Sequence, residues 1–248
     1  MFSGSGQNPD GGVFPLAGEG GGGLRWPGGP PRNAMKKYLV LAGNIGAGKS
    51  TLVGLLAQRL GFSPYYEPVA ENPYLADFYA DMPRWALQSQ LFFLTHRVRS
   101  HRALMEDPRS VVQDRSIYED AEIFARNLYE QGSMTDRDWG TYRNLYRTLI
   151  DLLPAPDLVV YLKASVPTLR KRIALRGREM EASIPASYLE GLNRLYEEWI
   201  EGFELSPALV VPCDRLDFVA ESKDLDAIVA EVEHRLRDRQ GELFPVGM

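Results

Sequence analysis

From residue 38 onward, short apolar runs alternate with longer stretches in which apolar positions recur at helical spacing. The run from Tyr38 to Ala42 is continuous and ends at a glycine-rich loop, as is typical of a parallel strand buried on both faces. Such runs predict strands at 38–42, 64–67, 110–114, 157–162 and 208–211. The amphipathic stretches predict helices at 49–60, 84–106, 117–131, 136–152, 166–176, 185–203 and 224–238. Because strand and helix alternate, we expect an α/β fold with a five-stranded parallel sheet flanked by helices.

Residues 1–34 differ from the rest of the chain in composition. Eleven of the 23 glycines fall within the first 30 residues, together with four prolines, and no hydrophobic period is visible. A segment with so little apolar content cannot bury enough surface to offset the entropy of ordering, so we expect a disordered tail. It also lacks the basic start and the apolar stretch of a secretory signal peptide. We therefore predict one folded domain, residues 35–248, after a Gly/Pro-rich tail.

Composition and charge exclude several classes of protein. The 248 residues carry 28 Lys and Arg against 33 Asp and Glu, and this net charge of −5 argues against a nucleic-acid-binding surface. A single cysteine, Cys213, excludes an intramolecular disulfide and fits a reducing, cytoplasmic location. Three histidines and one cysteine give no zinc-type spacing. No apolar run approaches the roughly 18 residues of a membrane span, so we expect no membrane partner.

The most specific motif lies between the first predicted strand and the first predicted helix. It reads Gly43-Asn44-Ile45-Gly46-Ala47-Gly48-Lys49-Ser50, followed by Thr51, and satisfies the pattern G-x-x-x-x-G-K-[ST]. The glycines let backbone N–H groups turn inward around phosphate oxygens, and the helix N-terminus and the Lys49 charge add to the attraction. The Ser50 hydroxyl is a ligand for Mg²⁺ in such loops. The sequence therefore predicts binding of a nucleoside triphosphate with Mg²⁺.

Two acidic residues follow predicted strands at the edge of the sheet where ligands bind in open α/β folds. Glu67 ends the second predicted strand, where a carboxylate could accept the proton of an attacking hydroxyl or could be a solvated loop residue. Asp114 ends the third predicted strand, which is a usual place for a Mg²⁺ ligand. Its neighbour Arg115 could stabilise phosphate charge.

A basic segment, RKRIALRGREME, spans residues 170–181. Such a segment is either a solvated helix face or an arginine lid over the transferring phosphoryl group. In an acidic chain with a phosphate loop, we favour the lid, formed by Arg172, Arg176 and Arg178.

Two neighbouring predicted helices carry residues that could recognise a nucleobase. Gln90, Phe93 and Arg97 share one face of a helix, and Asp120 and Phe124 form an i, i+4 pair on the next one. An amide, an ion pair and two rings could bind and stack a base. In isolation they could equally be core and salt-bridge residues.

Together these motifs resemble the deoxyribonucleoside kinase family, and they occur in the family's order from about residue 37 to 219. The matching segments are 43–50, Glu67-Pro68-Val69, Trp85 with Gln90 and Arg97, Asp114-Arg115-Ser116, and Arg172 with Arg176-Gly177-Arg178. DRSIYED and RGREME look most like the bacterial branch, which acts on deoxyadenosine, deoxyguanosine or deoxycytidine. The resemblance implies a P-loop kinase fold with an arginine lid, ATP as the phosphate donor, Mg²⁺, a deoxynucleoside substrate and a homodimer.

The resemblance also implies a role for each matching residue. Glu67 is expected to be the general base on the substrate 5′-hydroxyl, with Arg115 on that hydroxyl and the phosphates. Asp114 and Ser50 are expected to hold Mg²⁺, and Tyr79 and Glu181 to bind the sugar 3′-hydroxyl. The base is expected to contact Gln90, Phe93, Arg97, Asp120 and the stacking ring of Phe124. Arg172, Arg176 and Arg178 are expected to form the lid, and Asp217 and Phe218 to lie near the donor adenine. Family members with the Arg97–Asp120 pair accept purines or deoxycytidine. We therefore expect deoxyadenosine or deoxyguanosine to be preferred, with deoxycytidine possible, for nucleotide salvage.

Two alternatives fit part of the pattern. A nucleoside monophosphate kinase of the thymidylate type shares the phosphate loop, an Asp-Arg strand end and an arginine lid. It also needs a cation for the acceptor phosphate, usually beside the second strand, and residues 61–83 contain no Lys or Arg. A non-catalytic binding subunit with a kinase fold would have lost the base or the phosphate lysine, whereas Glu67 and Lys49 are both present.

Overall fold

The computed structural model describes residues 36–66, 72–178, 181 and 184–241. Five strands form one sheet: β1 (Tyr38–Gly43), β2 (Ser63–Tyr65), β3 (Val111–Asp114), β4 (Leu158–Lys163) and β5 (Ala208–Pro212). Their order is β2-β3-β1-β4-β5, and every adjacent pair is parallel. The predicted five-stranded parallel sheet is therefore confirmed. All six residues of β1 are buried, because both faces of this central strand are covered.

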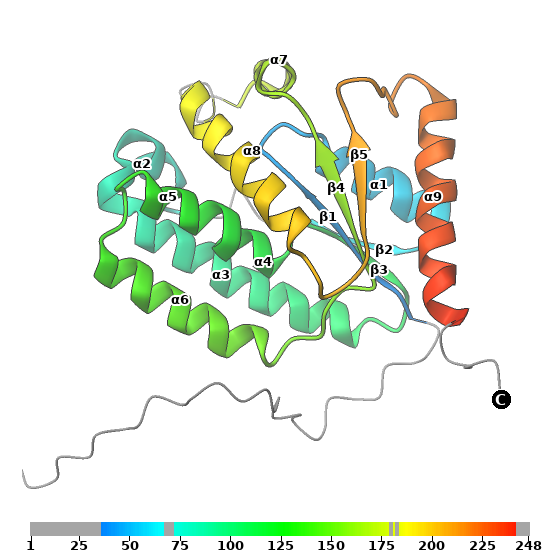
Figure 1. Ribbon diagram of the computed structural model, residues 1–248, viewed down its shortest axis with the longest axis horizontal. Helices are drawn as coiled ribbons and strands as arrows, with labels where there is room; N and C mark the ends of the chain where they lie inside the picture. The colour runs from blue at the N-terminus through cyan, green and yellow to red at the C-terminus, as the bar shows by residue number, and fades with distance from the viewer. Residues whose placement is uncertain (1–35, 67–71, 179–180, 182–183, 242–248) are drawn as a thin grey trace, which may run out of the picture. The chain divides into compact units, whose positions relative to one another are not determined.

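Helices cover the two faces of the sheet (Figure 1). The helices are α1 (Lys49–Leu60), α2 (Leu75–Ala80), α3 (Met82–Glu106), α4 (Ile117–Glu119), η2 (Asp120–Ala125), α5 (Arg126–Glu130), α6 (Asp136–Ile150), α7 (Val166–Arg176), α8 (Ala186–Glu201) and α9 (Ser222–Gly241). α1 packs against α9 and the sheet, while α3, α6 and α8 gather around the α4–η2–α5 segment on the opposite face. Within the described part of the chain, no helix is long and apolar enough to cross a bilayer.

Two predicted elements differ from the structure, and one short helix was not predicted. The predicted helix 117–131 contains a π-helical turn, η2, between two short α-helical pieces. α2 had no prediction, since its six residues are too few to show a helical period. The second strand was predicted at 64–67; it begins at Ser63 and ends at Tyr65, the residue paired with Gln113. It is an edge strand, which tolerates the missing N–H of Pro64.

The sheet order places the ligand-binding edge at β1. The chain passes from β1 to β2 on one side and later to β4 on the other, so the carboxyl end of β1 is a topological switch point. In open α/β sheets, ligands bind outside the strands at such a point. The phosphate-loop sequence follows β1 directly, and Asp114 ends the adjacent strand β3.

Candidate active site

The phosphate loop connects β1 to α1 through a backbone that requires glycine. Gly46 and Gly48 have φ values of 82° and 100°, in the left-handed region that side-chain-bearing residues rarely adopt. A Cβ on Gly46 would also lie 2.9 Å from both Leu169 O and Ile173 Cγ1 on the lid helix. Lys49, the first residue of α1, donates from Nζ to Gly43 O at 2.8 Å and to Asn44 O at 3.1 Å. The loop thus presents a helix N-terminus and a cation on one side, as anion binding requires.

Ser50 and Asp114 lie together, as predicted for the metal ligands. The Ser50 hydroxyl donates to Asp114 Oδ2 at 2.5 Å. The other carboxylate oxygen, Asp114 Oδ1, is buried without a hydrogen-bond partner among the described residues. A buried oxygen left in this way fits a cation, because Mg²⁺ prefers carboxylate and hydroxyl oxygens. The described residues contain no cluster of three His, Cys, Asp or Glu side chains, so most remaining ligands of such an ion would be phosphate oxygens and water.

A cavity of about 940 Å³ runs from the phosphate loop to α3 and η2. This volume lies at the upper end of the range for ligand pockets, which is about 300–1,000 Å³. Of the predicted site residues, the cavity is lined by Ile45, Gly46, Gly48, Lys49, Ser50, Thr51, Tyr79, Gln90, Phe93, Asp114, Arg115, Asp120, Phe124, Arg172, Arg176, Arg178, Glu181, Asp217 and Phe218. The predicted residues Gly43, Asn44, Ala47 and Arg97 do not line it, and Glu67 lies outside the described residues.

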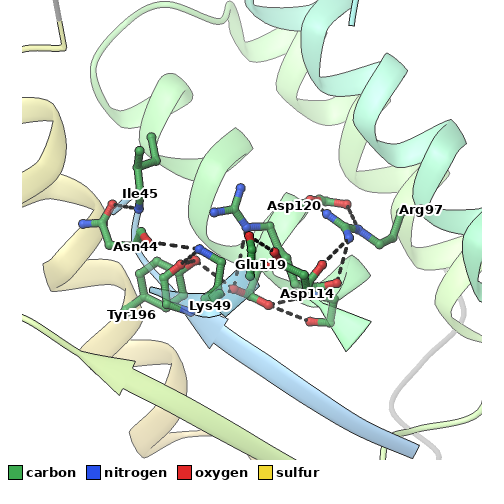
Figure 2. A network of polar contacts seen from close by, with 12 residues as sticks. Asn44, Ile45, Lys49, Arg97, Asp114, Glu119, Asp120 and Tyr196 are labelled. Atoms are coloured by element: carbon green, nitrogen blue, oxygen red, sulfur yellow. Dashed lines mark hydrogen bonds and ion pairs between the residues drawn. The ribbon is translucent and has the colours of Figure 1, made fainter. Parts of the chain in front are cut away.

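Arg97 of α3 and Asp120 of η2 form a buried ion pair (Figure 2). Arg97 Nε donates to Asp120 Oδ2 at 3.0 Å, and Nη2 donates to Oδ1 at 3.3 Å. The third nitrogen, Nη1, donates to the backbone carbonyls of Asp114 and Arg115. All three guanidinium nitrogens are therefore bonded inside the protein, while Asp120 reaches the cavity wall.

Arg115 is held in an unusual backbone conformation beside the cavity. Its φ of 66° is the only positive value outside glycine in the described chain. Its N–H donates to Leu41 O at 2.9 Å, and its carbonyl accepts from Arg97 at 2.7 Å, so both backbone groups are fixed. The guanidinium carbon lies 4.1 Å from the centre of the Phe124 ring. Strain of this kind is concentrated at functional sites, where the surrounding structure maintains it.

The lid arginines make different contacts. Arg172 of α7 donates to Ala47 O and to Cys213 O, both at 3.0 Å, and so fixes α7 to the phosphate loop. Arg176 and Arg178 both pair with the buried carboxylate of Glu181, with Arg178 Nη1 at 3.1 Å from Glu181 Oε1. Burial raises the pKa of the Cys213 thiol to about 11, against a smaller lowering by Arg172.

The segment before α9 closes the cavity at the phosphate-loop end. The ring of Phe218 lies against Gly48, since a Cβ there would be 3.2 Å from Phe218 Cζ. Asp217 accepts the N–H groups of Val219 and Ala220 at 3.2 and 3.0 Å, and these bonds lower the pKa of its carboxyl. Asp217 thus shapes the loop that carries Phe218.

The structure adds two buried residues that the sequence analysis missed. Glu119 and Tyr196 are fully buried and lie directly behind the phosphate loop (Figure 2). Glu119 could have been noticed, because Ser116 and Glu119 form a capping box at the start of α4, and this box has a recognisable spacing. Tyr196 gave no local signal, since it is one apolar-face residue of a long amphipathic helix.

Comparisons with known proteins agree with this geometry. The family model described as deoxynucleoside kinase matches residues 39–237. The deoxyadenosine/deoxycytidine kinase of Bacillus subtilis is 37% identical over 212 residues, covering 85% of this chain and 96% of that protein. The deoxyadenosine kinase of Lactobacillus acidophilus is 35% identical over 214 residues, covering 82% and 98%.

A solved structure extends the agreement to the fold. The deoxyadenosine kinase from M. mycoides with bound dATP superimposes with a TM-score of 0.70 at 31% identity, over 79% of this chain and 98% of that one. The five-stranded parallel sheet, the phosphate loop and the flanking helices are accordingly those of the P-loop kinase fold. This chain belongs to the deoxynucleoside kinase family.

Proposed function

We propose that this kinase transfers the γ-phosphate of ATP to the 5′-hydroxyl of a purine deoxyribonucleoside, with deoxyadenosine preferred, deoxyguanosine weaker and deoxycytidine possible. The product is the 5′-monophosphate, which fits a role in nucleotide salvage. Membership of the family makes the chain an ATP-dependent deoxynucleoside kinase, and the choice of base is our proposal. The observation that supports this choice of base is the Asp120 carboxylate, which lines the cavity and is paired with the buried Arg97.

Asp120 offers the base a hydrogen-bond acceptor. Adenine and cytosine carry an exocyclic amino donor at the edge where guanine and thymine carry a carbonyl oxygen. Because all three nitrogens of Arg97 donate within the protein, the carboxylate is the charged group that the base edge would meet. A carbonyl oxygen there would face a carboxylate and lose its own hydrogen bond, which costs about 1–3 kcal/mol for a buried group. Gln90 and the rings of Phe93 and Phe124 complete the proposed base site.

The reaction needs a base for the 5′-hydroxyl, and we propose Glu67. It follows β2 by two positions in the sequence, after the edge strand that pairs with β3. General base catalysis by a placed carboxylate typically contributes about 10²–10⁴ in rate. Arg115 lines the same cavity beside Asp114 and is proposed to contact the hydroxyl and the phosphates. Tyr79 and Glu181 also line it and are proposed to bind the sugar 3′-hydroxyl.

Positive charge at the phosphate end is supplied by several side chains. Lys49 and the backbone of the loop would bind the terminal phosphates of ATP, and Arg172, Arg176 and Arg178 would contact the transferring group from the lid. Ser50 and Asp114 would hold Mg²⁺, which neutralises charge on the phosphates when bound. The ring of Phe218 and the loop held by Asp217 are proposed to lie near the donor adenine.

The location, the assembly, the partners and the domain bounds are proposals that rest on the sequence and the resemblance. We propose that the protein is cytoplasmic and a homodimer, with no nucleic-acid or membrane partner. We also propose that residues 1–34 are a tail outside the catalytic domain, residues 35–248.

The alternative acceptor is a nucleoside monophosphate. Labelled ATP with Mg²⁺ should be incubated with deoxyadenosine and, separately, with its 5′-monophosphate. We expect label to appear in the monophosphate from the nucleoside, and no labelled diphosphate from the monophosphate. Labelled diphosphate alone would contradict the proposed function and favour the monophosphate kinase.

A further inference from the structure

The carboxyl end of β1 extends past its neighbour β3. The register between these strands ends at Leu41 opposite Asp114, and the Arg115 N–H donates to Leu41 O. Gly43, two residues further along β1, has no opposite residue in β3. Its buried backbone groups must therefore find other partners, since a buried polar group without one is costly.

The side chains of Glu119 and Tyr196, which Figure 2 shows close together, bond to the Gly43 backbone where β3 offers no partner. Glu119 Oε1 accepts the Gly43 N–H at 3.2 Å. The Tyr196 hydroxyl lies 2.8 Å from Gly43 O and 2.8 Å from Glu119 Oε1. Gly43 O also accepts from Lys49 Nζ at 2.8 Å. The backbone of one glycine residue thus connects a buried carboxyl group and a tyrosine to the lysine of the phosphate loop.

Both side chains are themselves firmly held. Glu119 Oε2 accepts from the Ser116 N–H at 2.8 Å and from the Ser116 hydroxyl at 3.2 Å, and neither Glu119 nor Tyr196 is exposed to solvent. Burial raises the pKa of the Glu119 carboxyl, while the charges of Arg115 and Lys49 oppose that rise. Helix α8 makes a second contact with the loop, since Asn44 Nδ2 donates to Asn193 Oδ1 at 2.7 Å.

We propose that Glu119 and Tyr196 are positioning residues that fix Gly43 and, through its carbonyl, the Lys49 ammonium in the phosphate-binding arrangement. Neither side chain lines the cavity, so both act through Gly43, and Glu119 also lies 3.9 Å from Arg115 Nε. The expected effect of the substitutions on turnover rests on the proposed function. Their expected effect on ATP binding rests only on the phosphate loop. Misplacing a reacting group by about 1 Å can cost about 10²-fold in rate. A phosphate loop whose position depends on two buried side chains is therefore sensitive to small shifts of those side chains.

The test uses four full-length variants. Tyr196→Phe removes only the hydroxyl. Glu119→Gln keeps the shape, but its amide nitrogen must face one of two N–H donors, Gly43 or Ser116. The double variant tests whether the two side chains act as one unit. Val232→Ala is the control for loss of core packing away from Gly43, Glu119 and Tyr196, which we call the network. Val232 lies in α9, on the opposite face of the sheet.

The measurements are the Kd of ATP–Mg²⁺ by calorimetry, kcat and KM for each substrate, and Tm. We expect Tyr196→Phe and Glu119→Gln each to weaken ATP binding and to lower kcat/KM for ATP by about 10–100-fold, with KM for deoxyadenosine unchanged in Tyr196→Phe. The double variant should be no worse than the poorer single variant, because coupled residues are not additive. Val232→Ala should lower Tm and leave the Kd of ATP unchanged.

Three results from the Glu119 and Tyr196 variants would overturn the proposal: wild-type ATP affinity in both single variants, an equal rise in KM for both substrates in Tyr196→Phe, or additive losses in the double variant. Equal losses of ATP affinity in Val232→Ala would also overturn it, since they would reflect general instability. If the wild-type protein phosphorylates no deoxynucleoside, the proposed function fails, and the ATP affinities of the four variants still decide this proposal.

Discussion

The two ends of the cavity are built in different ways. At one end, the loop from Gly43 to Ser50 is one contiguous segment, and its backbone and Lys49 are proposed to supply most of the phosphate-binding groups. At the end proposed to bind the nucleoside, the cavity wall is assembled from side chains of α2, α3, η2 and the segment after α7. In the proposed function, phosphate binding therefore follows from local backbone geometry. Recognition of the nucleoside would depend on how distant helices pack against one another.

Because of this difference, substitutions at the two ends of the cavity are expected to affect different properties of the enzyme. The phosphate end is proposed to bind a group common to all nucleoside triphosphates, so its variants should alter ATP affinity or turnover with any acceptor. The nucleoside end carries the buried pair of Arg97 and Asp120, so its variants should alter stability and the choice of base together.

The largest effect should come from the proposed general base. Glu67→Gln should lower kcat by about 10²–10⁴-fold, because the 5′-hydroxyl would lose its proton acceptor. ATP affinity should stay nearly constant, since the phosphate loop is intact. Stopped-time assays with labelled ATP measure kcat, and calorimetry measures the Kd of ATP. Glu71→Gln, four residues away in the same segment, is the matched control; near-wild-type kcat in Glu67→Gln would remove Glu67 from the mechanism.

The buried pair should give the next largest effect. Asp120→Ala leaves the Arg97 charge buried without its carboxylate, and breaking such a pair costs about 3–5 kcal/mol of stability. Arg97→Met strands Asp120 in the same way. The double variant removes both charges, so it should be more stable than either single variant. Denaturant titration gives the free energy of unfolding of each protein.

The same double variant sharpens the claim about base recognition. Removing both charges makes room for the methyl group of thymine, so thymidine phosphorylation should rise and activity on deoxyadenosine should fall. An unchanged ranking of the four deoxynucleosides would mean that this pair does not read the base.

Cys213 offers a smaller effect at the phosphate end. It lies on the cavity wall, and burial raises the pKa of its thiol to about 11. Only the thiolate is nucleophilic, so alkylation by iodoacetamide at pH 8 should be slow and should accelerate by about tenfold per pH unit until the pH approaches that pKa. Bound ATP should slow it further. Rapid labelling at pH 7 that ATP does not affect would contradict the buried position.

The smallest effect is expected from the N-terminal segment. Deleting residues 1–34 should leave Tm and kcat essentially unchanged, since this segment has too little apolar content to pack. A large drop in Tm on truncation would show that it docks on the kinase domain.

The sequence predicted the two ends of the cavity with different success. The strands, the phosphate loop and the Ser50–Asp114 pair were predictable because each depends on a short apolar run or on a fixed spacing. The approach of Arg97 to Asp120 was expected, but its three further bonds to backbone and carboxylate were not, because they depend on the packing of α3 against η2.

Other features could not be predicted from local sequence at all. The π-helical turn η2 and the left-handed Arg115 have no local sequence signal, since β3, α3 and the cavity wall impose them. Tyr196 lies 153 residues from Gly43 in the sequence, and only the fold brings the two together. Contacts between polar groups far apart in the sequence were thus not predictable from local sequence patterns.

The central claim is that the Asp120 carboxylate selects a base whose amino group lies at the edge where guanine and thymine carry a carbonyl oxygen. Its most direct test ranks deoxyadenosine, deoxyguanosine, deoxycytidine and thymidine by kcat/KM with ATP–Mg²⁺ and the wild-type protein. We predict deoxyadenosine first and thymidine last, with deoxyguanosine well below deoxyadenosine. A ranking led by deoxyguanosine or thymidine, whose bases carry a carbonyl oxygen at that edge, would contradict it.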